Sequence, residues 1–233
     1  SYLADESNTT LAETLKDAGF TTGAAVSASV LDSEFGIDQG FDTYQADMET
    51  GLEGNSVSQR RGGETTAVAL DWLADNKDER FFFFLHYFDP HTNYEPPEPF
   101  ASRFAQRPYV GEIAYTDHCI GQVLAKLKEL GLYDSTLIII TADHGEMIGE
   151  HGEPTHKFFI YQGAIKVPLI VKLPGQNKAA RIDSIAGIID IVPTVCSLLN
   201  VQTPEHVQGR AFLGKQLSPQ REYVFAARDR MDE

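Results

Sequence analysis

The sequence has 233 residues, of which 42% are hydrophobic and 10% aromatic, as expected for a globular protein with a sizeable core. This length allows one large α/β domain, or a domain with part of another. The formal net charge of −15 argues against nucleic acid as a general electrostatic partner, and no apolar stretch is long enough to cross a membrane. An anionic substrate stays compatible with this charge, because a bound metal and a few cations can reverse the field locally.

Helical and strand-like segments alternate along the chain. The patterns predict helices over residues 10–18, 64–76 and 109–130 and from Asp190 onward, and strands over 20–26, 80–87, 137–140, 167–172 and 182–188. Residues 27–63 are rich in glycine and predict loops. The continuous apolar runs at 80–87 and 137–140 are typical of strands buried on both faces. The alternation predicts an α/β fold, with a mostly parallel or mixed central sheet sandwiched between helices.

Three side chains within these helices call for a specific environment. Cys119 and Cys196 fall among apolar residues, which predicts two buried free thiols and neither a disulfide nor a zinc site. Asp117 lies beside the predicted apolar stripe of the 109–130 helix, which consists of Val110, Ile113, Ala114, Gly121, Leu124 and Leu127. A buried acid needs a partner, so we expect a supporting or capping role for Asp117.

An acid and an imidazole follow the most apolar strand of the chain. Asp143 and His144 stand where the strand 137–140 ends, and ligands of open α/β sheets gather at the carboxyl ends of strands. A carboxylate oxygen beside an imidazole nitrogen suits a divalent metal. The alternative is a plain turn, in which Asp143 accepts backbone N–H bonds and Gly145 supplies a positive φ.

Two further loops contain side chains that could carry chemistry. A proline-rich loop follows strand 80–87 and contains His91, whereas His86 is closer to the strand body and is expected to be a hydrogen-bonded core residue. The loop 149–157 contains His151, His156 and Lys157, potential cations that would suit an anion held beside a metal, or else a solvated loop.

Together these segments resemble the sulfatase family of the alkaline phosphatase superfamily over nearly the whole chain. The resemblance rests on several motifs that follow one another in the order of the family: residues 10–23, 36–42, 89–91, 109–121, 141–146, 149–152 and 157–168. It implies an alkaline phosphatase-like fold and a sulfuric ester hydrolase that uses a divalent metal, with Ca²⁺ first and Mg²⁺, Mn²⁺ or Zn²⁺ as alternatives. The substrate that it implies is a small-molecule or glycan sulfate ester, or an N-sulfate.

The resemblance also implies roles for individual residues. Asp143 and His144 match the second pair of metal ligands. His91 matches a catalytic histidine that contacts the sulfate and ester oxygens, and Lys157 a catalytic lysine that binds the sulfate group. His156 is an outer candidate for substrate binding without a firm counterpart in the family. A cation and a metal would neutralise a tetrahedral anion while His91 protonates the leaving oxygen.

One expected part of a sulfatase is not found in the sequence. Members of the family have an Asp-Asp metal pair and a Cys- or Ser-x-Pro-x-Arg motif, whose Cys or Ser becomes the formylglycine nucleophile. Neither occurs in these 233 residues. We therefore expect an internal fragment, incomplete at both ends, with residues 1–217 as a partial catalytic domain and 218–233 as the start of a C-terminal subdomain. Such a chain is expected to be inactive alone.

Two other functions stay open on the sequence. Many sulfatases have Asn at the position of His144. The histidine therefore leaves a phosphoester or phosphonate monoester hydrolase of the same superfamily as an alternative. A non-catalytic relative that binds a metal or an anion is the other alternative. Retention of Asp143, His144, His91 and Lys157 together argues against it. The family also suggests a periplasmic, extracellular or lysosome-like compartment, which no segment of the sequence specifies.

Overall fold

The structure is a computed structural model that describes residues 7–48, 58–156, 159–219 and 221–226. The chain divides into two compact units, an N-terminal unit over residues 1–133 and a C-terminal unit over residues 134–233. Each unit is described by itself below. The predicted domain boundary at residues 217 and 218 stays a prediction.

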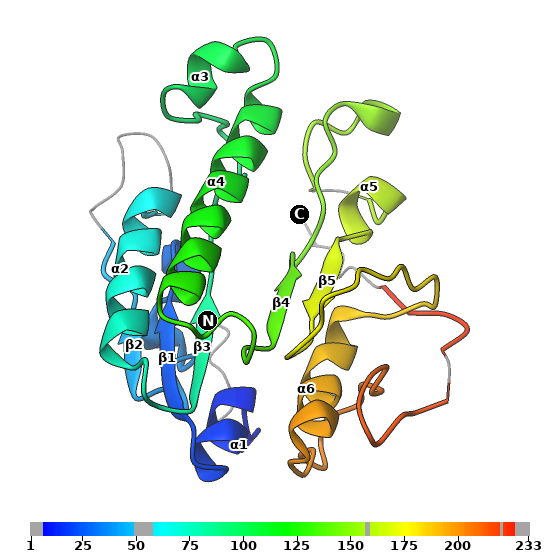
Figure 1. Ribbon diagram of the computed structural model, residues 1–233. Coiled ribbons are helices and arrows are strands. Elements are labelled where there is room, and N and C mark those ends of the chain that lie inside the picture. Colours follow the sequence, from blue (N-terminus) through cyan, green and yellow to red (C-terminus); the bar gives the residue numbers. More distant parts are fainter. Residues whose placement is uncertain (1–6, 49–57, 157–158, 220, 227–233) are drawn as a thin grey trace. The chain divides into compact units, whose positions relative to one another are not determined.

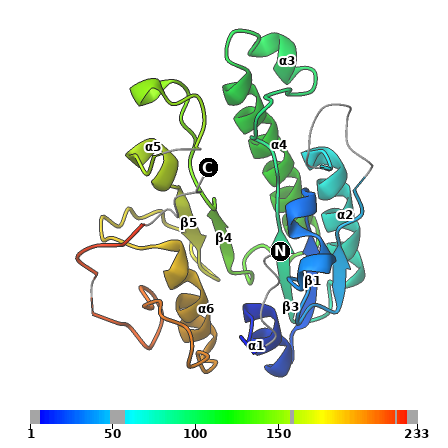
Figure 2. The ribbon, with the colours of Figure 1, turned by 180° about the vertical axis from the view of Figure 1, so that it is seen from behind.

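The N-terminal unit is a parallel sheet with helices. Its strands have the order β2-β1-β3, and both pairs are parallel. Helices α2 and α4 pack against each other and cover one face of this sheet (Figures 1 and 2). The elements are α1 (Leu11–Asp17), β1 (Thr21–Ala25), η1 (Ser29–Leu31), η2 (Ser33–Phe35), β2 (Thr43–Gln45), α2 (Gly62–Asp75), β3 (Phe81–Leu85), α3 (Phe100–Arg103) and α4 (Pro108–Glu129).

Local sequence explains how this unit is assembled. Thr10 and Glu13 form the predicted capping box at the start of α1, which satisfies two backbone N–H groups that the helix leaves unpaired. Helix α2 packs on β1 through Trp72. The contact requires glycine at position 23, since a Cβ there would lie 2.4 Å from Cε2 of the Trp72 ring. The indole N–H of Trp72 also donates to Oγ1 of Thr43 at 2.6 Å, which joins α2 to β2. The short strand β2 falls in the region where the sequence predicted only loops.

The buried face of α4 differs from the predicted stripe. The buried residues are Gly111, Glu112, Cys119 and Leu127, whereas Ile113 is 43% exposed. Asp117 is exposed, so the expectation of a buried acid at that position is wrong. The buried face of α4 includes the polar Glu112, so the orientation predicted from the apolar residues alone is wrong.

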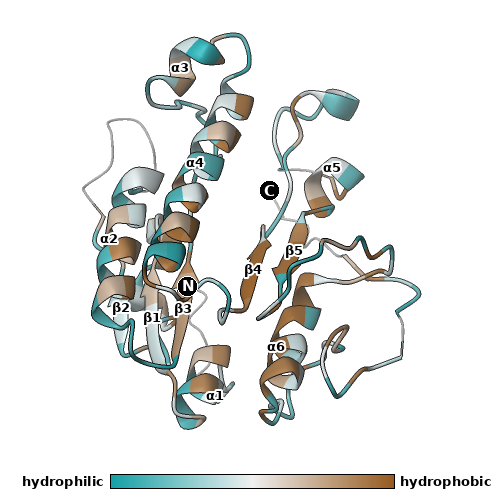
Figure 3. Cartoon of the chain, viewed as in Figure 1, coloured by the Kyte–Doolittle hydropathy of each residue, from teal (hydrophilic) through white to brown (hydrophobic). Residues whose placement is uncertain are grey.

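The C-terminal unit contains a two-stranded antiparallel sheet of β4 (Ile138–Thr141) and β5 (Leu169–Lys172). The other elements are η3 (Glu150–Gly152), α5 (Gln162–Ile165), η4 (Ile188–Asp190) and α6 (Ile191–Leu199). Figure 3 shows β4, β5 and α6 as predominantly hydrophobic segments. The described residues thus form a parallel sheet in one unit and an antiparallel pair of strands in the other.

Three predictions about strands are corrected. Residues 80–87 and 137–140 form strands, but neither is buried on both faces: Phe84 is 40% exposed and the isoleucines of β4 are only half-buried. Among the described residues of its unit, β4 pairs with β5 on one edge, and much of its surface is uncovered. Residues 182–188 form no strand; Ile185 makes one isolated bridge to Arg221. Of this segment only Ile188 is helical, as the first residue of η4.

Other features agree with the sequence. Cys119 and Cys196 are buried free thiols in α4 and α6. His86 accepts a hydrogen bond from the backbone of Ser27 at 3.4 Å, in keeping with a core role. In the part of the chain that the structure describes, no helix combines the length and the apolar character that a membrane span requires.

Candidate active site

The turn after β4 presents Asp143 and His144 to solvent. The side chain of Asp143 is 81% exposed and that of His144 is 40% exposed. Oδ1 of Asp143 accepts the backbone N–H of His144 at 2.9 Å, which fixes the turn and leaves Oδ2 pointing outward. The predicted turn is thus formed in part: Asp143 accepts a backbone N–H bond, but Gly145 does not have the positive φ that was expected. The predicted metal role of Asp143 stays a prediction.

The orientation of the His144 ring is suited to metal binding. Its Nδ1 lies 2.8 Å from the carbonyl oxygen of Gly145. Because a carbonyl oxygen can only accept, Nδ1 carries the proton of a neutral ring and the lone pair is on Nε2. Nε2 lies 3.6 Å from Oδ2 of Asp143, a separation that allows both atoms to bind one ion at about 2.0–2.6 Å. The two residues present fit a divalent metal.

The pair is backed by a second histidine and a buried glutamate. The rings of His144 and His156 are 4.0 Å apart between centroids. Nδ1 of His156 lies 3.2 Å from Oε1 of Glu146, whose side chain is only 6% exposed. Glu146 therefore anchors His156 against the ring of His144, an arrangement typical of the outer shell that orients metal ligands.

A close approach of two backbone segments fixes this turn in the unit. The N–H of Gly145 donates to the carbonyl of Ala164 in α5 at 2.7 Å. A Cβ at Gly145 would lie 2.0 Å from the carbonyl oxygen of Gly163, so only glycine fits there. The Asp143–Glu146 turn is thus held by α5, which follows later in the sequence.

The neighbouring loop places its histidines differently. His151 is exposed, has φ of 56° and stacks on the ring of Tyr161 with centroids 4.1 Å apart. Of the potential cations in this loop, His156 contacts His144, whereas Lys157 lies outside the described residues. The predicted role of Lys157 therefore stays a prediction.

His91 belongs to the N-terminal unit, on the loop after β3. Its ring stacks on Phe88 with centroids 4.1 Å apart, and its Nδ1 lies 2.7 Å from the carbonyl oxygen of Thr92. Nδ1 is therefore the proton donor in that bond, and Nε2 is the nitrogen that can exchange a proton with a substrate.

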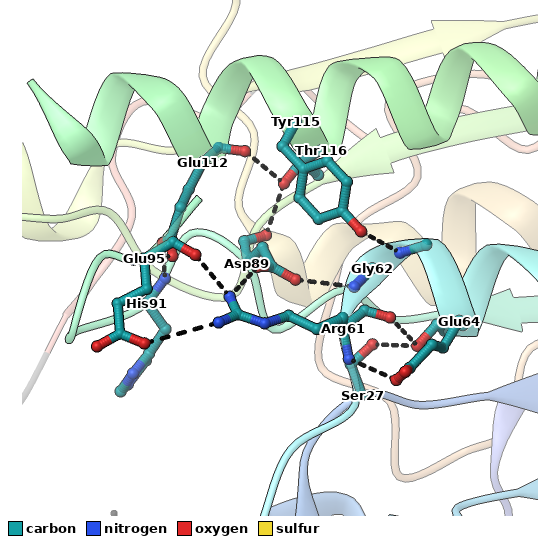
Figure 4. Close-up of polar contacts among 12 residues, drawn as sticks. Ser27, Arg61, Gly62, Glu64, Asp89, His91, Glu95, Glu112, Tyr115 and Thr116 are labelled. Atoms are coloured by element: carbon teal, nitrogen blue, oxygen red, sulfur yellow. Dashed lines mark hydrogen bonds and ion pairs between the residues drawn. The ribbon is translucent and has the colours of Figure 1, made fainter. Parts of the chain in front are cut away.

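Two buried carboxylates stand behind this loop, and the sequence analysis missed both (Figure 4). Asp89 is 8% exposed and Glu112 is 2% exposed. Burial raises the pKa of Glu112 to about 7, with a further contribution from the charge of Asp89 and opposition from backbone N–H bonds. Burial also raises the pKa of Asp89, against a bond from the N–H of Gly62 and the charge of Arg61. The sequence contains a signal for Glu112, which is an acid among apolar residues of the predicted 109–130 helix. The buried acid was predicted at Asp117 instead.

Among the residues that the structure describes, no group of three or more metal-binding side chains occurs. Asp143 and His144 by themselves do not complete the coordination of a divalent ion. The structure thus brings Asp143, His144 and His156 together in one unit and places His91 in the other.

The sulfatase family model matches residues 4–201, well over half of the chain. The chain belongs to the sulfatase family. Among curated relatives, an ulvan-active sulfatase of Formosa agariphila is 33% identical over 124 residues, which are 53% of this chain and 20% of that protein. The chain spans about a fifth of the length of the first curated relatives that it matches.

Solved structures show the fold of this sulfatase chain to be alkaline phosphatase-like. The phosphonate monoester hydrolase of Agrobacterium radiobacter superposes with a TM-score of 0.73 at 20% identity, over 90% of this chain and 62% of that one. A structure in complex with its substrate D-glucosamine-2-N,6-O-disulfate superposes with a TM-score of 0.70 at 19% identity, over 97% of this chain and 68% of that one. The two predictions of family and fold are confirmed.

Proposed function

We propose that this sulfatase chain is part of a metal-dependent hydrolase of sulfate esters or N-sulfates, and that turnover needs a formylglycine nucleophile from a segment outside these 233 residues. The observation that carries the proposal is the Asp143–His144 turn. Nε2 of His144 and Oδ2 of Asp143 lie 3.6 Å apart, with Nδ1 of His144 engaged by a carbonyl. The ion proposed for this pair is Ca²⁺, with Mg²⁺, Mn²⁺ or Zn²⁺ as alternatives.

Each remaining residue has a separate role in the proposal. When bound, the metal would withdraw negative charge from the anionic group of the substrate. His91, protonated on Nε2, would donate that proton to the leaving oxygen as the ester bond breaks. Lys157 would bind the sulfate oxygens by charge, and His156, held by Glu146, would contact the substrate from beside His144.

The organic part of the substrate is proposed to be a sugar or another small molecule. Two similar proteins support this class. One is the ulvan-active sulfatase, and the other is the structure in complex with D-glucosamine-2-N,6-O-disulfate. That sugar carries an N-sulfate and a sulfate ester. The whole protein's substrate therefore falls among small-molecule and glycan sulfates in this proposal.

A phosphonate or phosphate monoester hydrolase is the second candidate. It is favoured by His144 in the metal pair and by the structural likeness to a phosphonate monoester hydrolase. A non-catalytic metal- or anion-binding protein is the third candidate. Retention of Asp143, His144, His91 and Lys157 together counts against it, because a non-catalytic protein has no need for all four.

Lys157 and Lys172 allow a matched test of the site. In a protein that joins this chain to a nucleophile-bearing segment, Lys157→Ala is expected to lower kcat/KM for an aryl sulfate by about 10²-fold or more, because a charge that stabilises the transition state is lost. Lys172→Ala should leave it nearly unchanged, because Lys172 donates to the backbone carbonyls of Asp134 and Thr136. Equal losses would remove Lys157 from the site.

Two further measurements separate the candidates. The 233-residue chain alone should hydrolyse an aryl sulfate no faster than its Asp143→Ala variant, and clearly faster turnover would contradict the need for another segment. In the joined protein, a preference for an aryl phosphonate or phosphate over the sulfate would support the second candidate. Absence of any turnover, with a metal affinity that Asp143→Ala lowers, would support the third.

A further inference from the structure

The loop that carries His91 is attached to the helices at three positions. Oγ1 of Thr116 donates to the carbonyl of Asp89 at 3.0 Å. Glu112 accepts the backbone N–H of His91 at 3.1 Å through Oε2 and the backbone N–H of Glu95 at 2.7 Å through Oε1. Figure 4 shows the side chain of Glu112 reaching from α4 toward this loop. Both oxygens of one carboxylate are therefore occupied by N–H groups on either side of the loop.

Arg61 attaches the same loop from the opposite side. Its Nη1 donates to the carbonyl of Glu95 at 2.8 Å, and its guanidinium lies 3.7 Å from carboxylate oxygens of both Asp89 and Glu95. Asp89 in turn accepts the N–H of Gly62 at 3.0 Å, at the start of α2. The loop is thus connected to both α2 and α4.

The two bonds to Glu112 require an ionised carboxylate. Each oxygen accepts from an N–H group, and a carboxylate is the side chain that offers two acceptors at this spacing. A protonated carboxyl, or the amide of a glutamine, replaces one acceptor by a donor that would face an N–H group. One of the two bonds is then lost, and the loop is held at a single point.

We propose that Glu112 is a positioning residue for His91. Its carboxylate holds the backbone of His91 and Glu95 in one geometry, and so directs the His91 ring from a fixed loop. This proposal rests on the proposed function in one respect, namely that His91 acts on the substrate. The attachment of the loop to Glu112 stands on the structure alone.

Amide hydrogen exchange tests the attachment directly on the chain. At about pH 8, Glu112→Gln is expected to speed exchange of the His91 or Glu95 amide by at least about tenfold, the equivalent of one charge-assisted hydrogen bond. Exchange of both amides at the wild-type rate in the variant would overturn the proposal.

Glu13→Gln is the matched control. Glu13 also accepts a backbone N–H through its carboxylate, from Thr10 at 2.7 Å, but it caps α1 in the same unit. This variant should leave the exchange of residues 91–95 as in the wild-type protein at the same pH. A change there would mean that any altered carboxylate loosens the loop, which would overturn a specific role for Glu112.

Activity separates this proposal from the proposed function. In the joined protein, Glu112→Gln should lower kcat for an aryl sulfate with little change in KM, because His91 acts on the leaving oxygen. If exchange follows the expected pattern but kcat is unaffected, Glu112 does not position a catalytic group. If His91→Ala is itself fully active, the role of His91 in the proposed function has failed, whereas the attachment of its loop to Glu112 remains.

Discussion

At the scale of single residues, the burial of Glu112 costs free energy, while its carboxylate makes two specific hydrogen bonds. The carboxylate is 2% exposed and accepts two backbone N–H bonds, yet burial raises its pKa from 4.5 to about 7. The loss of hydration therefore outweighs the bonds that it makes when charged. A residue that is held at such cost is expected at a site where its charge is used.

The raised pKa predicts a stability that decreases with rising pH. Folded Glu112 binds its proton more tightly than the unfolded chain does, so its contribution is complete below about pH 4.5 and is lost as the pH rises through about 7. Between about pH 5 and pH 8 the free energy of unfolding should fall by up to about 3 kcal/mol relative to Glu112→Gln. Urea unfolding of both proteins at the two pH values checks this, and parallel pH profiles would contradict it.

At the scale of elements, helices serve as anchors for segments that have no regular structure. Helix α4 carries Glu112 and Thr116 and so holds the loop after β3. In the C-terminal unit, Asp190 stands at the start of α6 and is 2% exposed. It accepts bonds from Nε and Nη2 of Arg221 at 3.1 and 2.5 Å, and from the backbone N–H groups of Gly187 and Arg210. The segment after α6 is fastened at this point.

Removal of Arg221 should release that segment. Arg221→Ala is expected to lower the free energy of unfolding by about 3 kcal/mol, because it leaves a buried carboxylate with backbone donors only. Arg181→Ala is the control, since Arg181 and Asp183 form an ion pair with side chains 91% and 83% exposed, and should cost almost nothing. Similar losses in urea unfolding for the two variants would show that Asp190 needs no arginine.

At the scale of the whole molecule, the charge favours binding of cations. The net charge of −15 attracts positive ions in general, whereas the Asp143–His144 turn is the specific pair of ligands that we propose for them. General attraction decreases with salt, and binding at a specific pair decreases less. Substitution of single aspartates separates these two contributions.

Thermal unfolding in the presence of Ca²⁺ tests the metal site on the chain. Ca²⁺ should raise the Tm of the wild-type chain, and at about a hundred times its Kd the stabilisation is about 2.7 kcal/mol. Asp143→Asn should abolish most of the shift. Asp183→Asn, in the same unit with a side chain 83% exposed against 81% for Asp143, should keep it. An equal shift in all three proteins would mean that the ion binds elsewhere.

Features set by neighbours in the sequence were predictable from the sequence. The capping box at Thr10 and Glu13, the helix beginning near Asp190, the strand that ends before Asp143 and the two free thiols depend on local propensity and hydrophobic pattern. Membership in the sulfatase family was also predictable, because the motifs of the family follow one another in order along the chain. The orientation of α4 was not predictable in this way, since Glu112 interrupts the apolar face that the pattern requires.

The sequence by itself determined the family, the alternation of strands and helices, and the acid–imidazole pair after β4. Only the tertiary structure decided that Glu112 is buried, that Asp117 is exposed, that Gly145 contacts α5, and that His156 lies between Glu146 and the ring of His144. The physical reason is the range of the interactions. Propensity and capping act within a few residues, whereas burial of a charge depends on which distant segments pack around it.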